Sequence, residues 1–132
     1  MATATFQYKI NSKVTLGEKN QKTVRFYGTI TFSAAADTYA TGGLLPLAGA
    51  ALKNLGPFAD RVPLAVYIDS QIGSGWWYNW NQTTGKLMIL SGAGSGTAAP
   101  TEVTNNTALN ATTPQIFTDV VNFEAVFAVA TP

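Results

Sequence analysis

The sequence predicts an all-β protein, either an antiparallel β-sandwich of jelly-roll type or a small barrel, with at most one short helix. Three observations lead to this fold class. Apolar residues recur at every second position in several segments, which is typical of half-buried strands. Clusters of Gly, Pro and Asn separate these segments and favour turns. No series of helical segments alternates with them, as a parallel α/β fold would require.

The clearest early strand is Thr23–Phe32. Its apolar residues at even positions fall on one face, while Thr, Arg and Tyr residues at odd positions fall on the other. Gly28 occupies a position on the apolar face, which predicts a bulge or a close packing contact. Thr3–Ile10 and Lys13–Leu16 are weaker strand candidates ahead of it.

The middle of the chain contains a predicted hairpin and the best helix candidate. Val62–Asp69 alternates between apolar and polar residues, as a strand does. Trp76–Leu90 holds two β-forming segments on either side of Asn81–Gly85, whose composition favours a turn, and this arrangement indicates a hairpin. Leu47–Leu55 is rich in Ala and Leu and is followed by a Gly-Pro pair, so one or two helical turns are expected there.

The remaining elements are one strand and two long loops. Val121–Val129 alternates and is expected as the last strand. Ser33–Gly43 and Ser91–Gln115 consist mainly of small and polar residues. Because an unstructured loop as long as the second is unusual inside a domain, we expect it either to contain a short strand around Glu102 and Val103 or to reach out to a neighbouring molecule.

Residue composition excludes several kinds of chemistry. The 132 residues are enough for one domain, and they include no Cys and no His. Disulfides, thiolate nucleophiles and cysteine-ligated metals are therefore excluded. A Ser-His-Asp triad, an imidazole base and a histidine-ligated metal are excluded as well. The composition thus argues against an enzyme.

Charge is scarce and unevenly distributed. Charged residues make up 11% of the chain, against about 25% in an average soluble domain. A surface with so few charges indicates a protein that is largely covered by partners. Residues 1–25 carry five basic residues and one acidic residue, whereas residues 101–132 carry three acidic residues and no basic one. The two ends are expected to pair as neighbouring strands or to guide docking between subunits.

All three tryptophans lie within Gly75–Trp80. In strand geometry Trp76, Tyr78 and Trp80 share one face. Trp77 then points to the other face. Exposed rings would form a stacking platform for sugars or for bases. We favour the alternative, in which one face packs into the core and the other fills an interface between proteins, where Trp and Tyr are enriched.

The acidic residues form no recognisable catalytic or metal-binding pattern. A glycosidase needs two carboxyl groups roughly 5–10 Å apart, and no short motif brings two acids together. A calcium loop of the D-x-D-x-D type is absent. Gly92–Gly96 lacks the Lys-Ser/Thr ending of a phosphate-binding loop. We therefore expect no catalytic residue, no cofactor and no metal site. The acids considered are Asp37, Asp60, Asp69, Glu102, Asp119 and Glu124.

Neither a nucleic acid nor a membrane is an expected partner. The lysines of the first quarter alternate with Asn, Gln and Thr, and the net charge of +1 is low for a nucleic-acid-binding domain. Met1–Ile10 has no apolar signal core, and Thr38–Leu52 is interrupted by Gly and Pro. Synthesis in the cytoplasm is therefore expected.

Several short motifs occur in a characteristic order. They are a Tyr-x-Thr-Gly-Gly segment followed by leucines, an aromatic strand, a Thr-Gly-Lys-Leu turn and a closing strand, found in Thr38–Leu47, Val66-Tyr67, Gly75–Trp80, Thr84–Ile89 and Phe123–Phe127. This order resembles small virion proteins of tailed bacteriophages, namely capsid decoration (cement) proteins and related head structural proteins. The likeness extends over roughly residues 23–129.

The resemblance implies a compact β-rich subunit, typically a homotrimer, on the outside of a phage capsid. Such structural proteins bridge neighbouring subunits of the major capsid protein and have no catalytic residues. They often add an extended terminal arm, so we expect such an arm over residues 1–22 and a single β domain over residues 23–132. The protein would be synthesised in the host cytoplasm and reside in the virion, on the capsid exterior.

Eight residues are expected at interfaces of such an assembly. The lysines would face an acidic patch on the major capsid protein. The aromatic residues would lie in the core or at contacts between subunits. The eight are Lys9, Lys13, Lys19, Lys22, Tyr39, Trp76, Trp77 and Trp80.

Two other functions stay open. A carbohydrate-binding β-sandwich, in a phage tail or in receptor binding, would expose Trp76 or Trp77 beside a carboxylate or an Asn. A structural protein of the tail or neck would assemble as a ring instead of a trimer.

Overall fold

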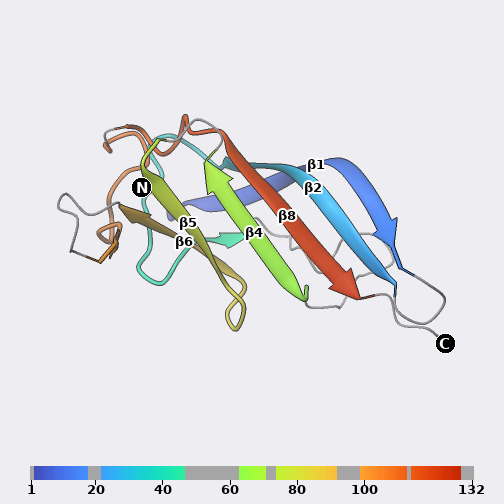
Figure 1. The fold of residues 1–132 in the computed structure, drawn as a ribbon. Helices are drawn as coiled ribbons and strands as arrows, with labels where there is room; N and C mark the ends of the chain where they lie inside the picture. The colour runs from blue at the N-terminus through green and yellow to red at the C-terminus, as the bar shows by residue number, and fades with distance from the viewer. Residues whose placement is uncertain are drawn as a thin grey trace.

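The protein is an all-β structure with two sheets (Figure 1). The computed structural model describes residues 2–17, 22–46, 63–70, 74–91, 99–112 and 114–128. No helix occurs in these ranges, and the expected helix at Leu47–Leu55 lies outside them. The fold class predicted from the sequence is confirmed. The strands of the described ranges are β1 (Thr5–Leu16), β2 (Thr23–Phe32), β3 (Leu45–Pro46), β4 (Ala65–Ser70), β5 (Trp76–Asn81), β6 (Lys86–Ser91), β7 (Thr101–Glu102) and β8 (Val121–Ala128).

The larger sheet has the strand order β3-β1-β2-β8-β4. Its four longer strands are antiparallel neighbours, and the short β3 joins the edge of β1 in parallel. β8 lies between β2 and β4, and it pairs with β2 from Thr23 opposite Ala128 to Ile30 opposite Val121. Of the basic segment 1–25, only Thr23–Arg25 lie opposite the acidic C-terminal strand, because β1 pairs with β2 and not with β8.

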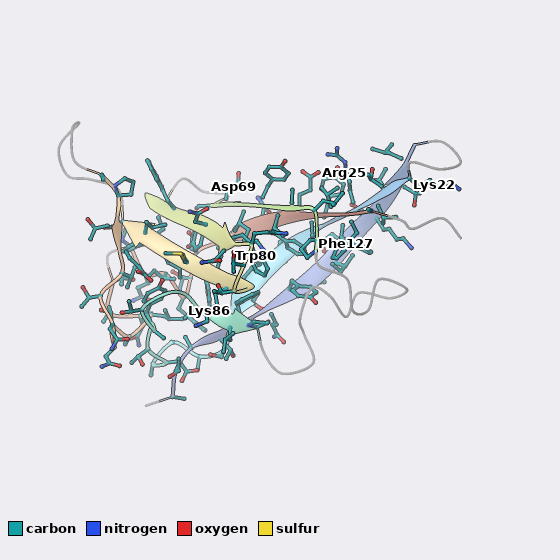
Figure 2. The ribbon with its side chains drawn as sticks, turned by 90° about the horizontal axis from the view of Figure 1, so that it is seen from below. Lys22, Arg25, Asp69, Trp80, Lys86 and Phe127 are labelled. Atoms are coloured by element: carbon teal, nitrogen blue, oxygen red, sulfur yellow. The ribbon has the colours of Figure 1, made fainter. Side chains whose placement is uncertain are left out.

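The two faces of the larger sheet differ in burial. Even-numbered residues of β2 and odd-numbered residues of β8 are buried, and we call this side the inner face. Their alternate neighbours form the outer face. Figure 2 shows Arg25 and Asp69 on one side of the sheet and Phe127 and Trp80 on the other. The alternation of side chains in a strand thus separates a core-forming face from a face open to partners.

A bulge in β1 changes which residues face the core. The register with β2 shifts between Ile10 and Ser12, so Lys9 lies opposite Thr29 and Lys13 lies opposite Phe26. Gly28 lies beside this bulge, and a Cβ atom there would overlap the carbonyl oxygen of Lys9 and lie 2.8 Å from the Phe123 ring. The close packing contact predicted at this glycine is confirmed.

The smaller sheet has the order β5-β6-β7. β5 and β6 form the expected hairpin, in which Asn81 Oδ1 accepts hydrogen bonds from the backbone N–H groups of Thr83 and Thr84, both at 3.0 Å. Gly85 closes the turn with a positive φ of 67°. β7 pairs with the end of β6. The short strand expected near Glu102 is therefore present.

The core lies between the two sheets. Phe6 of β1 meets the edge of Trp80 of β5 with ring centroids 6.1 Å apart, and Tyr8 meets Phe123 at 5.5 Å. Leu44 and Leu87 exchange backbone hydrogen bonds of 2.8 and 3.0 Å, which connect the segment before β3 to β6. Burial of aromatic and branched side chains from both sheets supplies most of the stabilisation.

Residues 5–16, within the segment expected as an arm, form β1 and pair with β2 from Phe6 to Leu16. Residues 11–17 are exposed. In Figure 1 the distal ends of β1, β2 and β8 extend past the smaller sheet, and Figure 2 shows the same from a second side. This part of the protein is therefore a projecting piece of sheet that is continuous with the domain.

Candidate functional site

The outer face of the larger sheet displays apolar side chains near its distal end. Val14 and Leu16 of β1 are 39% and 48% exposed, and Tyr67 of β4 is 61% exposed. Strand registers place these residues on the same face as a charged pair in the central strands. We call this surface the outer patch and define it as Val14, Leu16, Arg25, Tyr27, Tyr67 and Glu124.

The charges at the centre of the outer patch neutralise each other. Arg25 Nη1 donates a hydrogen bond of 2.7 Å to Glu124 Oε1. This hydrogen bond is the main reason that the pKa of Arg25 lies above its ordinary value. Tyr27 and Tyr67 lie on either side of Glu124 in the cross-strand register. A hollow of about 420 Å³, lined by both tyrosines, Glu124 and Asn122 among others, opens next to the pair. The two charges of the outer patch therefore neutralise each other, and the exposed Asp69 lines the same hollow beside Tyr67.

The structure does not gather the predicted lysines on one surface. Lys9 lies on the outer face, opposite Thr29. Lys13 lies on the inner face, with its ammonium group 5.9 Å from the centroid of the Phe26 ring. Lys22 is exposed just before β2, and Lys19 lies outside the described residues. Lys9 and Lys13 therefore lie on opposite faces of the sheet, because the bulge in β1 shifts the alternation between them. The contact of these lysines with an acidic capsid patch stays a prediction.

Tyr39, expected at an interface, is fully buried inside the chain. Its hydroxyl donates a hydrogen bond of 2.6 Å to Glu102 Oε1 and accepts one of 3.3 Å from the backbone N–H of Ile89. Gly42 N–H also donates to Glu102 Oε1 at 2.6 Å. Burial, followed by the hydrogen bond to Glu102, raises the pKa of Tyr39. The interface role is therefore corrected: this tyrosine connects the Thr-Gly-Gly segment to the smaller sheet.

The tryptophans lie as strand geometry predicts. Trp76 and Trp80 are partly buried against the core on the face that they share with Tyr78. Trp76 Nε1 donates a hydrogen bond of 2.9 Å to the carbonyl oxygen of Pro114. Trp77, on the opposite face, is 57% exposed. Of the three, Trp77 has the surface that a partner or ligand needs.

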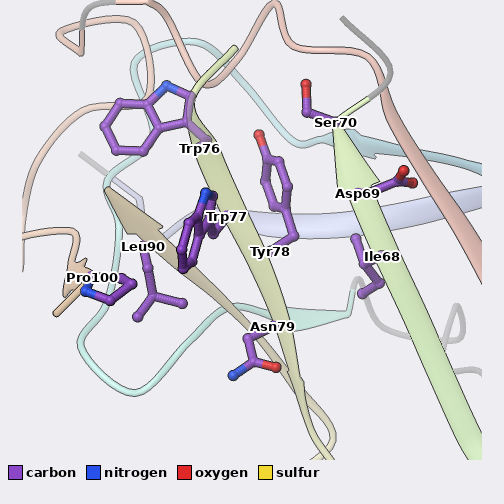
Figure 3. A pocket seen from close by; sticks show the side chains of 9 residues that line it. All are labelled: Ile68, Asp69, Ser70, Trp76, Trp77, Tyr78, Asn79, Leu90 and Pro100. Carbon is purple, nitrogen blue, oxygen red and sulfur yellow. The ribbon is translucent and has the colours of Figure 1, made fainter. Parts of the chain in front are cut away.

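A groove of about 530 Å³ runs between β4 and β5 (Figure 3). In the described residues each of these strands has a hydrogen-bonded neighbour on one side alone, so their free edges meet at this place. Figure 3 shows Tyr78 and Ile68 between β5 and β4, with the Trp77 ring directed away from β4 and the Asp69 carboxylate directed away from β5. The lining residues are Ile68, Asp69, Ser70, Trp76, Trp77, Tyr78, Asn79, Leu90 and Pro100.

A buried carboxylate holds one end of the groove together. Asp119 accepts hydrogen bonds from the hydroxyls of Ser70 at 2.8 Å, Ser74 at 2.7 Å and Tyr78 at 2.6 Å. Burial and the hydrogen bond to Asp119 raise the pKa of Tyr78 above its ordinary value. The network joins the end of β4, the start of β5 and the turn before β8. Spacing along the chain gave no signal for it, because its members are 41 to 49 positions from Asp119.

The described residues contain neither a candidate metal site nor a membrane-spanning helix, and comparisons with known proteins found no relative. Among the described residues no group of three or more acidic side chains lies where it could hold a metal ion. No helix in the described ranges is long and apolar enough to cross a membrane. Comparisons with protein-family models, with curated proteins and with solved structures found no match to this chain.

Proposed function

We propose that this protein is a non-enzymatic structural subunit of a tailed-phage virion, a decoration or cement protein that binds the outside of the capsid and bridges major capsid protein subunits. The order of motifs in the sequence supports this proposal, and the outer patch is the structural observation that carries it. Exposed Val14, Leu16 and Tyr67 surround an internally neutralised ion pair. Depletion of free charge and enrichment in tyrosine are typical of protein interfaces.

The proposed mechanism is additive stabilisation of the shell. Each copy covers part of two or more capsid subunits, and the contacts of all copies must be broken before the shell opens. A protein that docks in this way needs a rigid, low-charge surface and no catalytic group. The continuous pairing of β1, β2, β8 and β4 provides a rigid sheet beneath the outer patch. A homotrimer would place three outer patches on the lattice at once, which increases the effective affinity.

Co-sedimentation with capsids tests the proposal. We expect the protein to run as a trimer in light scattering and to sediment with shells of its phage from which it has been stripped. Tyr67→Asp, which introduces a charge at the most exposed ring of the outer patch, is expected to reduce binding at least about tenfold. Thr83→Asp, in the exposed turn between β5 and β6, is the matched control and is expected to bind normally. A monomer that stays in the supernatant contradicts the proposal, and a ring-shaped oligomer indicates a tail or neck position instead.

The two described β1 lysines provide a second test. If the outer face of the sheet docks on an acidic capsid surface, Lys9→Ala is expected to weaken binding and to reduce its dependence on salt. Lys13→Ala is expected to leave binding unchanged, because its ammonium group lies over Phe26 on the inner face. Capsid affinity measured at low and high ionic strength checks both variants. Equal effects of the two substitutions would contradict an acidic capsid surface opposite the outer face.

A further inference from the structure

Trp77 is not used by the docking surface proposed above. It belongs to β5, whereas the outer patch lies on the larger sheet. Its backbone pairs regularly with Leu90, and its side chain is nevertheless 57% exposed. An exposed indole beside a groove offers a flat apolar surface on which a ligand can stack.

Polar groups accompany the ring. Asp69 and Asn79 are exposed and line the same groove as Trp77. Neither side chain has a hydrogen-bond partner among the described residues. Among the described residues, no strand pairs with the facing edges of β4 and β5. The volume of about 530 Å³ lies in the range of small-molecule sites, which combine aromatic side chains with a few polar groups.

The charge of the groove restricts the ligand. Asp69 is its one ionisable carboxylate, and no cationic side chain is among the described residues that line it. A phosphate, a nucleic acid or an acidic sugar would therefore meet repulsion without compensation. A neutral saccharide carries no charge and is therefore not repelled by the groove. The apolar face of its ring stacks on an indole, and its hydroxyl groups exchange hydrogen bonds with an amide.

The groove is also formed in advance. Tyr78 and Ser70 line it and are both fixed by hydrogen bonds to Asp119. Such fixed side chains reduce the entropy that a ligand must lose on binding. We infer that the groove between β4 and β5 binds a neutral saccharide, with a sugar ring on Trp77 and with Asn79, on the same face of β5, as a hydrogen-bond partner.

A glycan array followed by calorimetry tests this inference. The probes are neutral oligosaccharides of hexoses and N-acetylhexosamines, with sialylated and uronic-acid glycans on the same array. We expect neutral glycans to bind, and binding of the best hit to be the same at low and high salt. Trp77→Ala is expected to weaken that binding about tenfold or more, and Trp77→Phe to weaken it less, because a smaller ring still stacks. Tyr67→Ala removes an equally exposed ring outside the groove and is expected to bind normally.

Several results would overturn the inference. They are the absence of any neutral hit, a preference for acidic glycans, and unchanged binding by Trp77→Ala. Loss of capsid binding by Trp77→Ala together with no glycan hit would assign the groove to a protein contact. The capsid proposal can fail separately, since it depends on Tyr67 and the outer patch. A variant series scored in both assays therefore distinguishes the two failures.

Discussion

At the scale of single residues, close packing decides positions that the sequence marks with weak signals. Gly28 interrupts a row of apolar residues in β2, because the two neighbouring strands leave no room for a side chain there. The carbonyl oxygen of Lys9 and the ring of Phe123 occupy the space that a side chain would need. A glycine inside a strand predicts such an approach, and here the prediction is confirmed.

Gly28→Ala is expected to destabilise the protein by about 3 kcal/mol, because either the β1 bulge or Phe123 must move. The free energy of unfolding, measured in urea, checks this value. Thr29→Ala, one residue further along β2 on the outer face, is the matched control and is expected to change it by less than about 1 kcal/mol. A similar effect of both substitutions would show that the bulge region adapts to a methyl group.

The positions of Tyr39 and of the two β1 lysines could not be predicted from neighbouring residues in the sequence. Tyr39 is one of the residues expected at an interface, yet its side chain is buried and its hydroxyl donates a hydrogen bond to Glu102, 63 positions later in the chain. Lys9 and Lys13 are an even number of positions apart, so an unbroken strand would place them on one face, but the bulge between them reverses the alternation. Both differences arise from contacts between distant segments, which periodicity does not record.

At the scale of elements, the prediction from sequence was most accurate where strands and turns are local. The β5–β6 hairpin follows from β-forming residues on both sides of an Asn-initiated turn, and the separation of Trp77 from Trp76 and Trp80 follows from the period of two. The groove could not be predicted, because it depends on how the edge of one sheet meets the edge of another. The Asp119 network is the contact that fixes this meeting.

Removing the carboxylate of Asp119 is expected to separate these elements. Asp119→Ala leaves the hydroxyls of Ser70, Ser74 and Tyr78 without their acceptor and is expected to cost about 2–4 kcal/mol in unfolding free energy. Asp119→Asn keeps one acceptor oxygen and is expected to cost less. Urea unfolding checks both values, and hydrogen exchange is expected to increase first in β4 and β5. Asp69→Asn, an exposed acid nearby, is the control, and an equal loss there would argue against a special role for the network.

At the scale of the whole molecule, three tyrosines are expected to make the protein less stable as the pH rises above about 10. Burial raises the pKa of Tyr8 to about 12, and burial with hydrogen bonding also raises the pKa of Tyr39 and Tyr78. In the unfolded chain a tyrosine loses its proton near pH 10. Their contribution is therefore fully present below about pH 10 and is lost as the pH rises toward the folded pKa values.

We expect the urea midpoint to stay constant from about pH 7 to pH 9 and to fall steadily above pH 10. Tyr8→Phe is expected to make this fall less steep, because one of the three groups can no longer ionise. Tyr67→Phe, an exposed tyrosine, is the matched control and is expected to follow the wild type. A midpoint that is independent of pH up to pH 11 would contradict the burial of these hydroxyls.

The position of β8 has a consequence for how the chain folds. Arg25 and Glu124 lie 99 positions apart in the chain, and the strands that carry them are neighbours at the centre of the larger sheet. While a ribosome is still making the residues between them, β2 has β1 on one side and an open backbone edge on the other. We expect folding to be slow, because β8 pairs with β2 only after the residues between them have been made. Until then the unpaired edge of β2 is the place where we expect unfinished chains to aggregate.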